Sequence, residues 1–248
     1  MEVSDIRAQF VSLYTTGTYV EDKSGSRLLE IVNASFVANE NSIFGKLDHD
    51  YIQRELTWYQ LQSRNVYDIQ GKVPDIWTRI CAKNGKINSN YGWCVFSSEN
   101  HSQYQECLLT LLEERLTRRA IMIYTRPSMQ FDAFDDGMDD FMCTNTVQYL
   151  IRNGKLHAIV NMRSNDAWAG YRNDFAWQRH VQDRLVEDYN THFAEIDQIE
   201  AGPIHWNVGS LHLYSRQFYL VDHYMKTGDH LISKTVYDMY QTRYITTS

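Results

Sequence analysis

Apolar residues recur along this chain at two spacings, one typical of helices and the other of strands. Spacings of three and four residues predict amphipathic helices; they occur at residues 4–17, 50–64, 100–112, 174–185 and 216–225. Runs that alternate in polarity, or that are rich in β-branched and aromatic residues, predict strands. Such runs occur at residues 28–37, 120–124, 141–150, 155–162 and 204–214. Helices and strands in this mixture predict an α/β (α+β) fold.

Polar residues mark the expected ends of these elements. Ser4 is the expected N-cap of the first helix, and Gly17 is its expected end. Asp174 is expected to cap the helix that follows Tyr171, where a carboxylate in the first turn complements the helix dipole. The acidic stretch 131–140 is expected to be an exposed loop.

The dipeptide Asn153-Gly154 is a strong signal for a two-residue hairpin turn. It separates the strand at 141–150 from the strand at 155–162, so these two strands are expected to pair. The return strand leads directly to Arg163, and the first strand contains Cys143. The hairpin therefore predicts that a thiol and a guanidinium lie in one neighbourhood.

Composition bounds the class of protein. The chain has 248 residues, 43% of them hydrophobic and 13% aromatic, which is enough for one large globular domain or two smaller ones. The net charge of −7 disfavours direct nucleic-acid binding, which requires a basic surface. No apolar run approaches the roughly 20 residues of a membrane span, and the acidic N-terminus lacks a signal-peptide pattern.

Four cysteines are scattered along the chain without the paired spacing of a metal site. They are Cys81, Cys94, Cys107 and Cys143. This usage fits a reducing compartment, so we expect a cytoplasmic protein without a bound metal. Cys143 by itself fits either a small buried hydrophobe or a nucleophile. A cysteine hydrolase is disfavoured, because no His–Asn or His–Asp pair is identifiable with it and His157 is only a hairpin neighbour.

Other candidate residues fit a functional role or an ordinary position on the protein surface. The loop around Lys23 fits a phosphate-binding turn or a solvated one. Glu55 lies within a helical pattern, where most glutamates are surface residues. The adjacent Arg118 and Arg119 fit a solvated pair or two forks for a phosphate. None of these signals identifies a function alone.

Together and in this order, eight segments resemble the thymidylate synthase family. They are the loop around Lys23 and residues 55–59, 90–92, 118–119, 141–150, 163–166, 170–174 and 209–215. The resemblance covers nearly the whole chain. It implies a single catalytic domain over residues 1–248, with a large mixed β-sheet flanked by helices, and a sheet-to-sheet homodimer.

The resemblance also implies roles for individual residues. Cys143 would add to carbon 6 of a pyrimidine, with Glu55 as general acid/base and Tyr91 in the proton network around carbon 5. Asp174 would contact the base. The remaining substrate residues would be Lys23, Arg163, Ser164, Asn165, His212 and Tyr214, with Arg118 and Arg119 contributed by the partner subunit. The folate residues would be Trp77, Asp166 and Gly170.

Departures from the common family pattern refine this expectation. Asp174 stands where thymidylate synthases have an Asn that reads uracil, and Thr144 replaces the His that usually follows the nucleophile. Segments beginning at Ile87, Ile121 and Asp140 look like the phage branch of the family. Residues 244–248 show no recognisable equivalent of the family's closing tail.

The expected reaction transfers a one-carbon unit from 5,10-methylenetetrahydrofolate to carbon 5 of dCMP. Capture of water would give 5-hydroxymethyl-dCMP and tetrahydrofolate. A dUMP hydroxymethylase or a thymidylate-synthase-like methyltransferase is the nearest alternative. A nucleotide-binding subunit without turnover, in a phage nucleotide-synthesis complex, is an alternative from another class. If the chain is phage-encoded, the expected location is the host cytoplasm.

Overall fold

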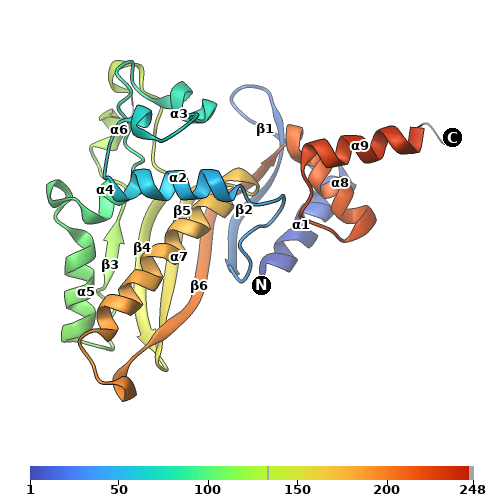
Figure 1. The fold of residues 1–248 in the computed structure, drawn as a ribbon. Helices are drawn as coiled ribbons and strands as arrows, with labels where there is room; N and C mark the ends of the chain where they lie inside the picture. The colour runs from blue at the N-terminus through green and yellow to red at the C-terminus, as the bar shows by residue number, and fades with distance from the viewer. Residues whose placement is uncertain (133, 246–248) are drawn as a thin grey trace. The chain divides into compact units, whose positions relative to one another are not determined.

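Six strands of this protein form one sheet in the order β1-β2-β6-β5-β4-β3 (Figure 1). The computed structural model describes residues 1–132 and 134–245, with side chains through residue 239. The strands are β1 (Val20–Glu21), β2 (Arg27–Val37), β3 (Ile121–Ile123), β4 (Thr144–Arg152), β5 (Lys155–Asp166) and β6 (Glu200–Tyr214). The α-helices are α1 (Val3–Thr16), α2 (His49–Gln60), α3 (Asp75–Ile80), α4 (Tyr91–Phe96), α5 (Gln103–Glu113), α6 (Met129–Asp132), α7 (Ala169–Asn190), α8 (Phe218–Thr227) and α9 (Lys234–Ile245). The expected combination of helices with a large sheet is confirmed.

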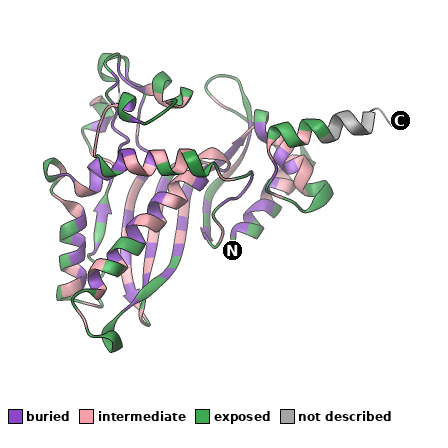
Figure 2. Ribbon diagram, in the orientation of Figure 1, coloured by how far each residue is buried: buried purple, intermediate pink, exposed green. Residues whose placement is uncertain are grey.

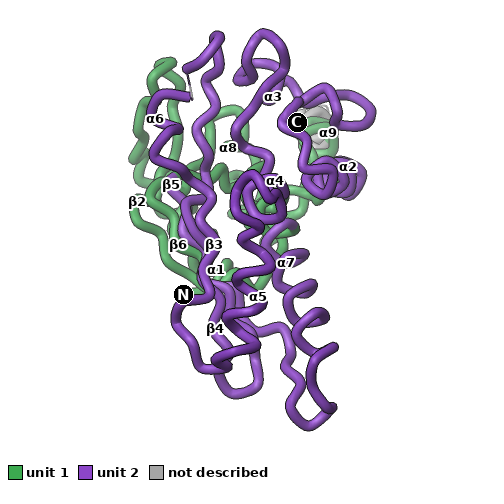
Figure 3. Tube along the Cα trace, turned by 90° about the vertical axis from the view of Figure 1, so that its left-hand side faces the viewer, with its two compact units in different colours: residues 1–48, 164–176, 206–248 green, residues 49–163, 177–205 purple. Residues whose placement is uncertain are grey.

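The chain folds into two compact units, each made of discontinuous segments (Figure 3). Unit 1 contains residues 1–48, 164–176 and 206–248, and unit 2 contains residues 49–163 and 177–205. The chain passes from one unit to the other before α2, at residues 48 and 49, and within β5, α7 and β6.

The predicted hairpin between β4 and β5 is present. Asn153 and Gly154 have φ angles of 51° and 72°, the left-handed backbone that a type I′ turn needs at both positions. Antiparallel pairing then continues from the turn back to Thr144, with a register shift between Thr144 and Thr146. The strand that was expected from residue 141 therefore begins at Thr144, and Cys143 lies immediately before it.

Side chains along β5 alternate between buried and more exposed positions (Figure 2). Leu156, Ala158, Val160 and Met162 are the buried set, as their spacing predicted. Helix α7 covers this part of unit 2, because the Gln182 side-chain amide donates to the carbonyl of Leu156 at 2.6 Å.

Strand β3 is shorter and more exposed than its apolar sequence suggested. Met122 is buried, but Ile121 and Ile123 are 41% and 50% exposed. The continuous apolar run at 120–124 is typical of a strand buried on both faces, and that interpretation is wrong for two of the three strand residues. The reason is that side chains alternate between the two faces of a strand, and only the face that carries Met122 is covered.

The first helix ends at Gly17 as expected, with the glycine at a φ of 67°. Its start differs from the prediction, because the N-cap is Glu2 and Ser4 lies inside the helix. The Asp5 carboxylate accepts a hydrogen bond from the Glu2 backbone N–H at 2.8 Å. A carboxylate in the first turn thus performs the capping that was assigned to a serine.

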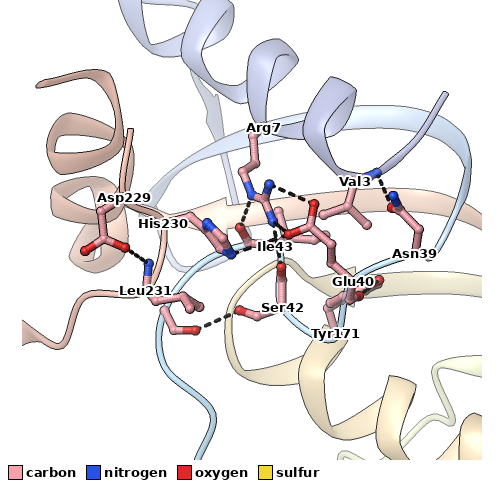
Figure 4. A network of polar contacts seen from close by, with 11 residues as sticks. Val3, Arg7, Asn39, Glu40, Ser42, Ile43, Tyr171, Asp229, His230 and Leu231 are labelled. Atoms are coloured by element: carbon pink, nitrogen blue, oxygen red, sulfur yellow. Dashed lines mark hydrogen bonds and ion pairs between the residues drawn. The ribbon is translucent and has the colours of Figure 1, made fainter. Parts of the chain in front are cut away.

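A buried arginine organises unit 1 (Figure 4). Arg7 is 4% exposed, and its guanidinium donates to the carbonyl of Ile43 at 2.7 Å and to the Glu40 carboxylate. The Tyr171 hydroxyl donates to the carbonyl of Glu40 at 2.7 Å. Since Tyr171 lies in the first turn of α7, this network ties the start of that helix to the loop after β2.

Within the described residues, no helix combines the length and the apolar character that crossing a bilayer demands.

Gly92 is required by a close contact in unit 2. A Cβ atom there would lie 1.8 Å from the backbone oxygen of Tyr59, at the end of α2. The Asn90 side chain holds α4 in this place by donating to the carbonyls of Trp58 at 3.1 Å and Ser63 at 2.7 Å.

We expect Gly92→Ala to lower the free energy of unfolding by about 3 kcal/mol or more, because a backbone atom cannot give way as a side chain does. Urea denaturation measures this change. Gly154→Ala is the control, because a Cβ added there would meet no atom within 4 Å and only its φ of 72° is unfavourable. Its expected cost is about 1–2 kcal/mol. A smaller loss for Gly92→Ala than for Gly154→Ala would contradict the contact.

Candidate active site

Cys143 lies beside a guanidinium, as the hairpin predicted. The Nη2 atom of Arg163 is 3.8 Å from the Cys143 Sγ. The backbone N–H of Arg163 donates to the carbonyl of Cys143 at 2.9 Å. Its guanidinium also donates to the carbonyls of Met142, at 3.0 Å, and Phe141. A cation at this distance favours the thiolate, which is the nucleophilic form.

The other three cysteines are buried, whereas Cys143 is half-buried. Burial raises the pKa of Cys94 and of Cys107 to about 12, which keeps both as neutral thiols. The alternative of Cys143 as one more small core hydrophobe does not fit its greater exposure or its charged neighbour.

A buried carboxylate holds the segment that leads to the thiol. Asp140 is 2% exposed, and it accepts hydrogen bonds from the backbone N–H groups of Asn88 at 2.7 Å and Ser89 at 2.8 Å. The Ser89 hydroxyl donates to it at 2.6 Å. Burial raises the pKa of Asp140, while these donors oppose the shift. The expectation that residues 131–140 form an exposed loop is therefore wrong at Asp140 and at Met138, which is also buried, and residues 131–132 belong to α6.

Thr144 replaces the expected histidine with a fully buried side chain. Its exposed fraction is 0%, and its Oγ1 has no hydrogen-bond partner among the described residues. Nothing in the structure explains why threonine stands here.

Glu55 is one of the few buried acidic residues, with 5% of its surface exposed. The Tyr51 hydroxyl donates to its Oε1 at 2.7 Å. Tyr91 is 4% exposed and stacks on Tyr59, with ring centroids 5.3 Å apart. The interpretation of Glu55 as a surface residue is therefore excluded. Unit 2 thus holds the candidate nucleophile, its cation and the candidate acid/base groups.

Unit 1 holds the candidate base-reading group. The Asn165 amide donates to Asp174 Oδ2 at 2.7 Å, and Asn165 is 3% exposed. A Cβ on Gly170 would lie 3.1 Å from the Asn165 Nδ2, so glycine leaves room for this pair. Asp174 is not in the first turn as expected, because α7 begins earlier, at Ala169. The interpretation of Asp174 as a cap is therefore wrong.

The other unit 1 candidates lie along β5 and β6. Asp166 accepts from the Trp168 backbone N–H at 2.8 Å, and burial raises its pKa. The rings of His212 and Tyr214 lie 5.0 Å apart, consistent with the expected shared face of the strand. Ser164 lies on β5 between Arg163 and the Asn165 side chain described above.

Two predicted phosphate contacts remain predictions. In the Lys23 loop, the backbone N–H groups of Ser24 and Ser26 donate to the Asp22 carboxylate at 2.8 and 2.9 Å. The chain's own carboxylate therefore occupies the N–H groups that were considered for an anion, leaving the exposed Lys23 as the candidate. Arg118 and Arg119 are exposed, and Arg119 lies 3.4 Å from Glu114.

The chain belongs to the thymidylate synthase family: the model of that family, described as thymidylate synthase, matches residues 12–235. It is 55% identical over 237 residues to the deoxycytidylate 5-hydroxymethyltransferase of Enterobacteria phage T4, a match that covers 96% of each chain. The enzyme of the same name from Enterobacteria phage T6 is 54% identical over 94% of this chain and 95% of that relative.

Thymidylate synthases themselves are more distant. The Bacillus atrophaeus enzyme is 29% identical over 171 residues, or 66% of this chain and 69% of the relative. A solved structure, thermostable thymidylate synthase A from Bacillus subtilis, matches with a TM-score of 0.66 and 21% identity. That match covers 91% of this chain and 84% of the other, and it confirms the predicted fold.

Sequence reasoning missed two residues that support the candidate site. The first is Asp140, which lies in an acidic stretch whose composition is typical of an exposed loop. The second is Tyr51, which lies one helical turn before Glu55 and was open to detection by that i,i+4 spacing. No cluster of three or more His, Cys, Asp or Glu side chains suited to a metal occurs among the residues that the structure describes.

We expect iodoacetamide to modify the native protein at Cys143 alone, with the site read by peptide mass spectrometry. Arg163→Gln should slow this modification at pH 7 by about fivefold to tenfold, because loss of the cation disfavours the thiolate. Arg179→Gln is a matched control, since that arginine lies on α7 and pairs with Asp183 at 3.8 Å. Equal rates for Arg163→Gln and the wild type would argue against an activated thiol.

Proposed function

We propose that this protein transfers a one-carbon unit from 5,10-methylenetetrahydrofolate to carbon 5 of dCMP and completes the reaction with water. The products are 5-hydroxymethyl-dCMP and tetrahydrofolate. The observation that carries this proposal is the 55% identity, over 96% of the chain, to a phage deoxycytidylate 5-hydroxymethyltransferase. The presence of Asp174 at the base-reading position supports the same choice of substrate.

Carbon 5 of a pyrimidine is a weak nucleophile, so the protein must activate it. The Cys143 thiolate adds to carbon 6, and the ring electrons then become available at carbon 5. Arg163, 3.8 Å from the sulfur, stabilises the thiolate before attack. 5,10-Methylenetetrahydrofolate supplies the one-carbon unit when bound.

Asp174 selects cytosine through the edge that it presents. Cytosine offers an acceptor at N3 and a donor at N4, whereas uracil offers a donor at N3 and an acceptor at O4. A carboxyl that shares one proton with N3 matches cytosine, and an ionised carboxylate facing O4 leaves acceptor against acceptor. The Asn165 amide supports this role, since its bond to Oδ2 at 2.7 Å orients the carboxyl group.

The shared proton has a second effect, because it withdraws charge from the ring and favours thiolate addition at carbon 6. Glu55 organises the water that completes the reaction and accepts its proton, with Tyr91 in the same proton network. The buried position of Glu55 and its hydrogen bond from the Tyr51 hydroxyl at 2.7 Å support this role, because they hold the carboxylate in one orientation.

The remaining assignments follow the family resemblance. The 5′-phosphate is bound by Lys23, Arg163, Ser164 and the partner subunit's Arg118 and Arg119, the deoxyribose 3′-hydroxyl by His212 and Tyr214, and the folate by Trp77, Asp166 and Gly170. One catalytic domain spans residues 1–248, and it acts in the host cytoplasm within a phage nucleotide-synthesis complex. The net charge of −7 disfavours direct nucleic-acid binding.

The protein acts as a homodimer in this proposal. The dimer is supported by the exposed face of β3 in unit 2, where Ile121 and Ile123 are 41% and 50% exposed. Apolar side chains in this position are typical of a surface that a second copy covers. The exposed Arg118 and Arg119 lie three and two residues before the same strand.

The proposed reaction is tested by incubating the protein with 5,10-methylenetetrahydrofolate and dCMP, dUMP or CMP in turn. Mass spectrometry should find a dCMP product heavier by one CH2O unit, with tetrahydrofolate as the co-product. A methylated nucleotide accompanied by dihydrofolate would instead identify a methyltransferase. Binding of dCMP without any product would identify a nucleotide-binding subunit.

Asp174→Asn should shift the ratio of kcat/KM for dCMP and dUMP toward dUMP by about 100-fold, because an amide matches the uracil edge. Steady-state kinetics with both nucleotides measures the shift. Asp183→Asn is the matched control, since Asp183 is 56% exposed on the same helix. An unchanged ratio in Asp174→Asn would remove Asp174 from base selection.

A further inference from the structure

Tyr51 links two residues of unit 2 that the family resemblance assigns to different parts of the reaction. Tyr51 and Glu55 lie one turn apart on α2, and Trp77 lies on α3. The indole Nε1–H of Trp77 donates to the Tyr51 hydroxyl oxygen at 2.6 Å. The Tyr51 hydroxyl in turn donates to Glu55 Oε1 at 2.7 Å.

These two hydrogen bonds form a relay from Trp77 through Tyr51 to Glu55. The donors and acceptors available determine its direction. An indole N–H only donates, so the Tyr51 oxygen must accept from Trp77. The single phenolic hydrogen is then directed to the Glu55 carboxylate, which accepts it when ionised. Burial, followed by the nearby Glu55, raises the pKa of Tyr51 far above its usual value. The phenol therefore remains a donor throughout the working pH range.

The Tyr51 ring is held in place by its neighbour. The Arg54 guanidinium lies over the ring at 5.3 Å from its centroid, and it donates to Asp50 at 2.9 Å. The same guanidinium donates to the carbonyls of Gln70 at 2.8 Å and Lys72 at 3.0 Å. These bonds tie α2 to the segment that leads into α3, so the distance from Tyr51 to Trp77 is fixed from both ends.

We propose that Tyr51 is a positioning residue that couples the folate-contacting Trp77 to the orientation of Glu55 during water capture. This inference rests on the proposed function. A hydrogen bond to Oε1 fixes the plane of the carboxylate, and therefore the direction in which Glu55 receives a proton. Rotation of the carboxylate would misplace the water, although Cys143 and Asp174 would still bind dCMP.

The step that Tyr51 assists is addition of water to the exocyclic methylene group on carbon 5. The water oxygen bonds to the methylene carbon, and one water proton passes to Glu55. The π electrons move into the ring. They then form the carbon 5–carbon 6 double bond as the bond from carbon 6 to the Cys143 sulfur breaks. No oxidant or reductant is needed, because the one-carbon unit stays at the oxidation level at which it arrives.

The test is Tyr51→Phe, which retains the ring and removes the relay. We expect kcat for hydroxymethylation to fall by about 10- to 100-fold, as loss of a general acid/base contact typically does, with KM for dCMP within about twofold of wild type. Added 2-mercaptoethanol competes with water for the methylene intermediate. The fraction of thioether nucleotide among the products, measured by mass spectrometry, should rise in the variant.

Tyr67→Phe is the matched control, because Tyr67 is 60% exposed in the same unit. Its kcat and its product fraction should equal those of the wild type. Unchanged kcat and product fraction in Tyr51→Phe would overturn the proposal. A wild-type protein that forms no 5-hydroxymethyl-dCMP would instead defeat the proposed function itself.

A second variant keeps the test decisive if Tyr51→Phe folds poorly. Trp77→Phe retains an aromatic ring and removes the N–H that directs the Tyr51 hydroxyl. It should raise the thioether fraction in the same direction, and the double variant should add nothing further, because both changes break one relay. Independent, additive effects of the two changes on the product fraction would contradict a relay through Tyr51.

Discussion

Arg163 is the side chain on which the candidate nucleophile depends. Cys143 lies just outside the regular pairing of β4, so no sheet ladder fixes the backbone before it. The Arg163 guanidinium supplies bonds to the carbonyls of Phe141 and Met142, and the same group stands 3.8 Å from the sulfur. One cation therefore shapes the segment and favours the thiolate. A shift of one residue in the β4–β5 pairing would turn the Arg163 side chain to the opposite face of the sheet.

Carboxylates of this protein differ in role because their donors differ. Asp140 accepts hydrogen bonds from the backbone N–H groups of Asn88 and Ser89 and from the Ser89 hydroxyl. These bonds hold in place the segment that leads to Cys143. Glu55 is buried with a tyrosine donor, and Asp174 is oriented by the Asn165 amide. Burial raises the pKa of Asp140, and its donors oppose that shift. The partners of the three carboxylates agree with the roles proposed above, which are backbone support for Asp140, proton transfer for Glu55 and base reading for Asp174.

Departures from the family pattern fall beside the groups that do the chemistry. Asp174 replaces the uracil-reading amide, and its partner Asn165 fits against Gly170, where a Cβ would crowd the amide at 3.1 Å. Thr144 follows the thiol with a buried hydroxyl that has no hydrogen-bond partner among the described residues. The proposed base selection therefore depends on the Asn165–Asp174 pair and on the space that Gly170 leaves for it.

Local sequence signals were enough to predict the elements whose causes are local. The left-handed turn at Asn153-Gly154 and the alternation along β5 follow from short-range sterics and period, and these two features alone suffice to predict that Cys143 and Arg163 are neighbours. Tertiary structure decided what depends on distant partners. It buried Asp140, left one face of β3 exposed, and joined Tyr51 to Trp77. Burial and hydrogen bonding are set by distant chain segments that no local pattern contains.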